Sequence, residues 1–242
     1  MAFIIEKEIW EQFPGLAYVV AHADGIDAGA AVDLRADVEA EHADLLSSWT
    51  YPNPQSHPHI GAWRSAFRDA MGVSGGKFPS AVEALVRRVV SGKGVLPINP
   101  IVDFYNLVSV RHVVPVGGWD VDSLLGGDIV LRHTRQGETF TELGGGEEPV
   151  AAGEVCYSDA EELITRHFVW RQSEHAKVTP ATRRLFLVSE ILPEVGAEVA
   201  QAVRSSFVEG LKRYFGVDPL TAVVTDSAAR WEWGDEPGRS RR

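Results

Sequence analysis

The chain has 242 residues, of which 45% are hydrophobic, 24% are charged and 9% are aromatic. This composition is ordinary for a globular protein and excludes a disordered chain, a collagen-like repeat and a disulfide scaffold. The 34 acidic and 23 basic residues give a net charge of −11, which argues against DNA as a partner because phosphate contacts need Lys and Arg. The single cysteine, Cys156, excludes an intramolecular disulfide and a multi-cysteine zinc site.

Neither a leader nor a membrane span is predicted. The apolar N-terminus is interrupted at once by Glu6 and Lys7, which is not the pattern of a signal peptide. The longest apolar stretch, residues 15–21, is much shorter than the roughly 20 residues that cross a bilayer. We therefore expect a cytoplasmic protein that does not contact a membrane.

The first half of the chain is predicted to be mainly helical. Short strands are expected at residues 3–5 and 16–20, with a turn between them at Pro14. Apolar residues at helical spacing then predict helices over residues 34–49 and over 58–71. Ser80 with Glu83 forms a capping box that opens a helix through residue 89, and Asn99 caps a further helix that ends near residue 112.

The second half is predicted to be richer in strands. We expect a hairpin formed by residues 128–133 and 139–143, further strands at 155–157, 163–170 and 185–189, and a long helix over 192–215. Helices followed by strands and a closing helix indicate an α+β fold, with a mixed β-sheet flanked by helices. We expect residues 1–225 to form a single domain and residues 226–242 a flexible tail.

Common catalytic signatures are absent from the sequence, including the phosphate-binding P-loop, the G-x-S-x-G elbow and the H-E-x-x-H metal motif. His57 and His59 could serve a metal, but no Asp, Glu or Cys of matching spacing accompanies them, which favours the start of a helix. Cys156 lies in an apolar strand, which favours an inert core thiol over a nucleophile. We predict no metal and no cofactor.

Polar side chains gather in two otherwise apolar segments, residues 97–106 and 170–179. In the first, Asp103 and Asn106 share a helix face because they are three residues apart. The second follows a predicted strand, where polar loops often bind ligands. Two interpretations fit: a polar pocket between this helix and this loop, or a solvated surface loop.

The same segments resemble the B3/B4 editing domain of the bacterial phenylalanyl-tRNA synthetase β subunit. Several of that family's motifs occur in order over about residues 58–190: Leu96-Pro97-Ile98-Asn99 to Asn106, Pro115 to Asp120, Gly127 to Arg132, Gln136-Gly137-Glu138 and Gln172 to Thr182. The resemblance implies a B3/B4-like fold, transient binding of mischarged tRNA, and hydrolysis of its aminoacyl ester in trans without a cofactor. A second interpretation is a non-catalytic module that binds tRNA, an amino acid or a nucleoside, and a third is an interaction domain with a vestigial pocket.

Site residues also follow from the resemblance. Asn106 matches a pocket asparagine of the family, Tyr105 stands where the family has threonine, and Gly117 stands where it has a pocket histidine. Val188 falls where the family has a substrate-reading glutamate, and Glu190 could supply that carboxylate if the strand register shifted or a bulge intervened. The expected catalytic residues are Asn106, Gln172 and Ser173. The expected substrate-binding residues are Asp103, Tyr105, Gly117, Gly118, Arg171, Lys177 and Glu190.

Overall fold

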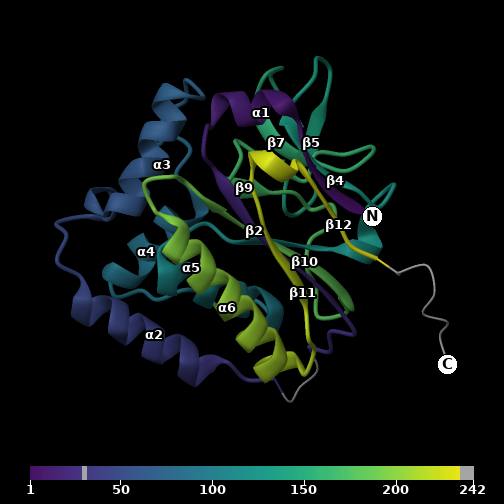
Figure 1. Cartoon of the computed structure of the whole chain (residues 1–242). Coiled ribbons are helices and arrows are strands. Elements are labelled where there is room, and N and C mark those ends of the chain that lie inside the picture. Colours follow the sequence, from purple (N-terminus) through teal and green to yellow (C-terminus); the bar gives the residue numbers. More distant parts are fainter. Residues whose placement is uncertain (29–31, 235–242) are drawn as a thin grey trace, which may run out of the picture.

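The computed structural model describes residues 1–28 and 32–234, and Figure 1 shows the arrangement of its elements. The helices are α1 (Lys7–Gln12), α2 (Arg35–Ser48), α3 (Pro58–Asp69), α4 (Ala81–Val90), α5 (Pro100–His112) and α6 (Ala197–Phe215). The longer strands are β1 (Ala2–Ile5), β2 (Ala17–Asp24), β3 (Gly117–Asp120), β4 (Ile129–His133), β7 (Val155–Ser158), β10 (Arg184–Ile191) and β11 (Leu220–Val224). The shorter ones are β5 (Thr139–Thr141), β6 (Glu147–Pro149), β8 (Thr165–Arg166), β9 (Arg171–Gln172) and β12 (Arg230–Glu232). The predicted α+β class is confirmed.

The strands form two four-stranded sheets. One sheet has the order β12-β1-β4-β7 and is mixed, because β1 is parallel to β4 and the other pairs are antiparallel. The other sheet, β11-β2-β10-β3, is antiparallel throughout. Two short ribbons, β5-β6 and β8-β9, lie outside these sheets.

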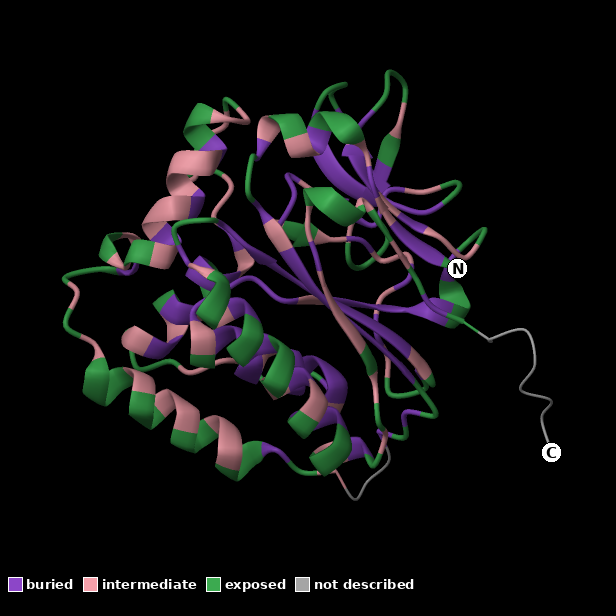
Figure 2. Cartoon of the chain, in the orientation of Figure 1, coloured by how far each residue is buried: buried purple, intermediate pink, exposed green. Residues whose placement is uncertain are grey.

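Aromatic side chains join the two sheets. Phe3 of β1 lies 5.6 Å from Phe186 of β10, and Tyr157 of β7 lies 4.9 Å from Trp119 of β3, measured between ring centroids. All four side chains are buried, so these contacts form the core between the sheets. Figure 2 shows most of the strand residues in this region as buried.

Helices α5 and α6 are buried against the rest of the fold as their apolar pattern predicts. Val203, Phe207 and Leu211 of α6 are fully buried, and α6 lies beside β2 and α5 (Figure 1). The predicted caps are present, because the Asn99 side chain accepts hydrogen bonds from the backbone N–H groups of Ile101 and Val102 at 3.1 and 3.0 Å. Ser80 caps α4 in the same way, because its hydroxyl oxygen accepts a hydrogen bond from Glu83 N–H at 3.4 Å.

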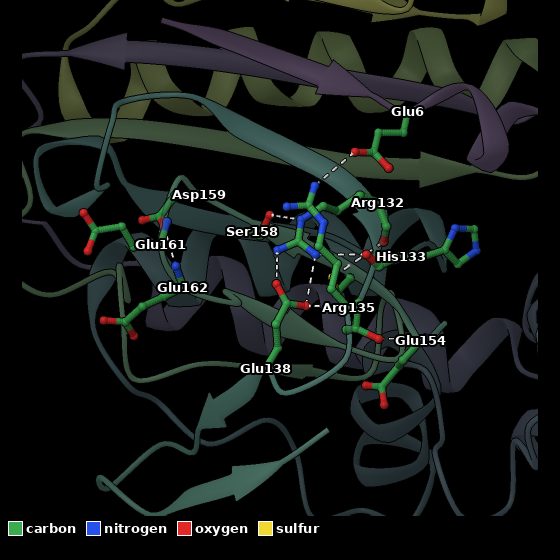
Figure 3. A network of polar contacts seen from close by, with 12 residues as sticks. Glu6, Arg132, His133, Arg135, Glu138, Glu154, Ser158, Asp159, Glu161 and Glu162 are labelled. Carbon is green, nitrogen blue, oxygen red and sulfur yellow. Dashed lines mark hydrogen bonds and ion pairs between the residues drawn. The ribbon is translucent and has the colours of Figure 1, made fainter. Parts of the chain in front are cut away.

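The predicted hairpin of residues 128–133 and 139–143 is wrong. Strand β4 pairs with β1 and β7, whereas β5 pairs with β6. Arg132 accounts for the path of the chain after β4. Its side chain is buried and donates to the Glu138 carboxylate at 2.7 Å and to Ser158 Oγ at 2.8 Å (Figure 3). The bond to Glu138 ties the end of the segment 133–138 to β4, and the bond to Ser158 joins β4 to β7. The apolar alternation showed that strands exist but did not specify their partners.

Two other segments differ from expectation. The predicted strand 163–170 is interrupted. Leu163 forms an isolated bridge with Ser158, and residues 165–166 form the short strand β8. His167 and Phe168 then have φ of 43° and 60°, which extended strands do not adopt. In the expected tail, β12 pairs with β1, and Trp233 is 3% exposed. Aromatic residues at 231 and 233 provide the apolar surface that fixes this part. Residues 235–242, the remainder of the predicted tail, lie outside the described residues.

Among the described residues, no helix is long and apolar enough to cross a membrane. The same part of the chain contains no group of three or more His, Cys, Asp or Glu residues arranged to hold a metal ion. His57 is the N-cap of α3, where its Nδ1 accepts from His59 N–H at 3.3 Å. Cys156 is buried, and burial raises the pKa of its thiol to about 12, so this thiol carries little thiolate at neutral pH.

Candidate functional site

A pocket of about 360 Å³ opens where α4, α5 and β10 approach one another. Helices α4 and α5 and strand β10 contribute to its wall. The lining residues lie within 81–88, 98–106, 115–119 and 165–172, together with Tyr157, Val188 and Glu190. We call this cavity the α5 pocket. It brings together six of the residues expected from the sequence: Tyr105, Asn106, Gly117, Arg171, Gln172 and Glu190.

Helix α5 fixes the first two of these residues. Most of its side chains are buried, including Ile101, Phe104 and Val108, so the helix cannot rotate without disrupting the core. Tyr105 is 8% exposed, and burial raises the pKa of its hydroxyl above the usual range. Asn106 is half-buried, and no hydrogen bond among the described residues uses its carboxamide. This amide can therefore bind a ligand.

Strand β3 contributes two adjacent glycines with different roles. A Cβ at Gly117 would meet no atom within 4 Å, so the pocket has open space where a side chain could stand. A Cβ at Gly118 would lie 2.7 Å from Leu187 Cδ2 and 3.3 Å from the Tyr105 ring. Gly118 is thus required for the packing of β3 against α5 and β10.

The two glycines therefore predict opposite outcomes for the same substitution. Gly118→Ala should lower the free energy of unfolding by about 1–3 kcal/mol, because it overpacks a buried contact. Gly117→Ala should change it by less than about 0.5 kcal/mol, because the new methyl group enters open space. Urea denaturation of both variants measures this difference. Equal stabilities of the two variants would contradict the assignment.

Glu190 lines the pocket without any change of strand register. Strand β10 pairs with β2 continuously from Arg184 to Ile191, with Val188 opposite Val20 and Glu190 opposite Tyr18. Side chains two residues apart lie on the same face of a strand, and both Val188 and Glu190 reach the pocket. The register shift or bulge considered from the sequence is not needed.

The environment of Glu190 is apolar. The side chain is 2% exposed, and one oxygen accepts a short hydrogen bond from the Tyr157 hydroxyl. Burial raises the pKa of the Glu190 carboxyl to about 7, and the bond from Tyr157 only partly opposes this shift. The pocket therefore contains a carboxyl group that titrates near neutral pH.

The segment after Trp170 supplies the polar rim. Arg171 donates to the Glu142 carboxylate at 2.5 Å, and its guanidinium lies 4.4 Å from the Trp170 ring centroid. Gln172 donates from Nε2 to the backbone oxygen of Gly118 at 3.0 Å. The loop is thus bound to β3, which places the Gln172 amide in the pocket wall.

Other expected residues lie beside the pocket and do not line it. Ser173 is fully buried, and its hydroxyl donates to the Thr141 backbone oxygen at 2.9 Å. Lys177 pairs with Glu174. Asp103 accepts from Ile98 N–H at 2.8 Å and lines a neighbouring groove, and burial raises the pKa of its carboxyl.

Comparison with known proteins assigns this arrangement to a family. A family model described as the B3/4 domain matches residues 68–209, more than half of the chain. The chain belongs to the B3/4 domain family. The match includes α5, β3, the polar rim and β10, and so all the residues that line the pocket from position 81 to 190.

Curated relatives of this B3/4 domain are phenylalanine–tRNA ligase β subunits. The protein from Symbiobacterium thermophilum is 30% identical over 169 residues, which cover 69% of this chain and 18% of the relative. The protein from Geobacter metallireducens is 37% identical over 105 residues, 43% of this chain and 13% of the relative. The chain thus spans less than a fifth of the length of these relatives. A solved N-terminal fragment of the phenylalanyl-tRNA synthetase β subunit from Pyrococcus horikoshii, 11% identical, aligns with a TM-score of 0.46 over 93% of this chain and 54% of the fragment.

Sequence reasoning missed two further polar or aromatic residues of this B3/4 domain that line the pocket, Trp119 and Tyr157. Trp119 is 2% exposed, and its indole N–H has no partner among the described residues. Because Trp119 is two residues after Gly117 in β3, strand alternation could have identified it. Tyr157 of β7 carries no such signal, since only tertiary packing brings β7 to this pocket. Arg88 of α4 also lines the pocket; in the sequence, the basic pair Arg87-Arg88 fits either a local nucleic-acid contact or a solvated helix face.

Proposed function

We propose that this chain is a trans-editing deacylase that hydrolyses the aminoacyl ester of a mischarged tRNA. The observation that carries the proposal is the Asn106 amide, which has no hydrogen-bond partner among the described residues and stands in the wall of a largely apolar pocket. The membership of the B3/4 family, whose relatives are phenylalanine–tRNA ligase β subunits, supports a substrate of this class. The tRNA is bound transiently, since the net charge of −11 opposes tight binding.

The reaction adds water to the ester carbonyl carbon and releases the ribose oxygen with a proton. Hydrogen-bond donors for the carbonyl oxygen and a positioned water are sufficient assistance for this chemistry. The Asn106 amide N–H donates to the carbonyl oxygen as it gains negative charge. Gln172 uses Nε2 on Gly118 and keeps Oε1 to orient the attacking water.

The remaining pocket residues contact the amino acid and the phosphate backbone near the tRNA end. Tyr105 and the apolar side chains around it surround the amino-acid side chain, and Glu190 offers a carboxyl to any polar group on it. Arg88 and Arg171 are the positively charged residues among the residues that line the pocket, and they face the tRNA end. The Arg171–Glu142 pair is largely exposed, so exchange of Glu142 for a phosphate costs little free energy.

A panel of mischarged tRNAs tests the proposal. Purified protein is mixed with each tRNA, and release of the free amino acid is compared with a control without enzyme. We expect rapid release from one subset, which also identifies the amino acid. If a folded preparation releases no amino acid from any tRNA, the proposed activity is wrong.

A second candidate is a module that binds without hydrolysis. It is favoured by the internal bonds of Gln172 and Arg171, which occupy two of the polar groups of the rim. A module for a free small molecule should bind with little dependence on salt. Binding of tRNA should instead weaken steeply between low and moderate salt.

A further inference from the structure

A second cavity adjoins the α5 pocket and is not used by the mechanism above. It is a groove of about 600 Å³ between α2 and the segment 95–110, and we call it the α2 groove. Ile98 and Asn106 line both cavities. The Asn106 amide, which the proposed function places at the scissile ester, therefore stands at the junction of two binding spaces.

Helix α2 leaves this groove open. The helix forms where the sequence predicts it, but none of its side chains is buried, and Figure 2 shows it at the edge of the molecule without a buried stripe. Polar contacts hold it in place: Arg111 donates to Glu41 at 2.6 Å, and Arg213 donates to Asp37 at 3.0 Å. No side chain of α2 therefore fills the groove, and its apolar wall stays accessible.

The charges of the groove restrict its ligand. Asp33 is paired with Arg35 and Glu41 with Arg111, which leaves Glu39 and Asp103 as carboxylates without a cation among the described residues. One oxygen of Asp103 accepts from Ile98 N–H, and the other has no partner in the described part of the chain. Such a groove disfavours phosphate and suits a neutral ligand with apolar faces and hydroxyl donors.

We propose that the α2 groove binds the terminal nucleoside of the substrate, with Asp103 accepting from the free ribose hydroxyl. This inference rests on the proposed function, because it assigns the two halves of one aminoacyl-nucleoside to two cavities. The amino acid occupies the α5 pocket and the nucleoside the α2 groove. The ester that joins them then lies at Asn106, between the cavities.

Direct binding of adenosine to the full chain tests the groove without requiring hydrolysis. Titration calorimetry compares wild type with Val38→Trp, which fills the groove from α2, and with Asp103→Asn. We expect each variant to weaken adenosine binding at least tenfold, and 2′,3′-dideoxyadenosine to bind the wild type at least tenfold more weakly than adenosine. Leu46→Trp is the matched control, because Leu46 lies on the same helix, is 46% exposed and does not line the groove.

The inference and the proposed function fail in different ways. If adenosine does not bind at millimolar concentration, or binds equally to wild type, Val38→Trp and Asp103→Asn, the groove assignment is wrong even if mischarged tRNA is hydrolysed. If adenosine binds as expected but no ester is cleaved, the nucleoside site is supported and the proposed deacylase activity is wrong. If esters are cleaved, kcat/KM can be measured for a 3′-aminoacyl adenosine and for the methyl ester of the same amino acid. Val38→Trp should lower the ratio of the first value to the second at least tenfold.

Discussion

Replacement of Asn106 by alanine should lower kcat/KM for the cognate mischarged tRNA by about 100-fold, which corresponds to about 2.7 kcal/mol of transition-state stabilisation. The reason is that the Asn106 amide is the unpaired hydrogen-bond donor where the pocket and the groove meet. Because no hydrogen bond among the described residues is lost with the amide, the free energy of unfolding should change by less than about 1 kcal/mol. Single-turnover deacylation and urea denaturation measure the two quantities separately.

Two comparisons make this prediction specific. Asn106→Asp retains the size of the side chain but replaces the N–H donor by an acceptor, so it should be at least as defective as Asn106→Ala. Asn53→Ala is the matched control, because Asn53 caps the 3-10 helix Pro54–Ser56 through Ser56 N–H at 3.1 Å and does not line the α5 pocket. Activity of Asn106→Ala within threefold of the wild type would contradict the assigned role.

Local signals in the sequence predicted what is determined locally. The caps at Ser80 and Asn99 fixed the beginnings of α4 and α5, and the apolar stripe of α6 identified its buried face. The spacing after this cap places Asp103 and Asn106 on one face of α5, whereas the assignment of Asn106 to a pocket came from the resemblance to the B3/B4 domain. Helix α1 was missed because its six residues are too few for a helical period to be distinguished.

Long-range pairing was not accessible in the same way. The turn at Gly137 resembles that of a hairpin, yet β4 pairs with β1, which is more than 120 residues away in the sequence. The residues of a strand indicate that the strand is buried but not which other strand pairs with it. For the same reason, Arg88 and Tyr157 could not be assigned to the pocket, and Ser173 could not be recognised as a buried residue whose hydroxyl already donates to the chain.

Glu190 should make the free energy of unfolding decrease as pH rises. Its folded-state pKa of about 7 lies above the ordinary value of 4.5, so between these values the folded chain holds a proton that the unfolded chain has lost. The free energy of unfolding therefore falls between pH 4.5 and pH 7 and levels off above pH 7. The total fall is up to about 3 kcal/mol, because the two pKa values differ by about 2.5. Glu190→Gln removes this contribution, because the amide does not titrate.

The comparison must be made as a difference between wild type and variant. Burial lowers the pKa of several histidines, including His57 and His112, each to about 4, and their contribution to stability is lost as pH falls. This trend opposes that of Glu190, so the wild-type curve alone can be flat. We expect the stability of Glu190→Gln relative to wild type to increase by about 2.5 kcal/mol between pH 5 and pH 8, measured by urea denaturation. Glu194→Gln, at an exposed position, controls for the loss of one negative charge.

Tyr157→Phe provides an independent check on the cause. The Tyr157 hydroxyl donates to Glu190, and this bond lowers the pKa of the carboxyl against the larger effect of burial. Its removal should raise the pKa of Glu190 further, so the loss of stability should extend to higher pH than in the wild type. A relative stability of Glu190→Gln that does not depend on pH would show that the carboxyl is ionised throughout. The polar end of the α5 pocket would then bear a fixed negative charge at neutral pH, and substrates with a cationic group in place of a hydroxyl would be favoured.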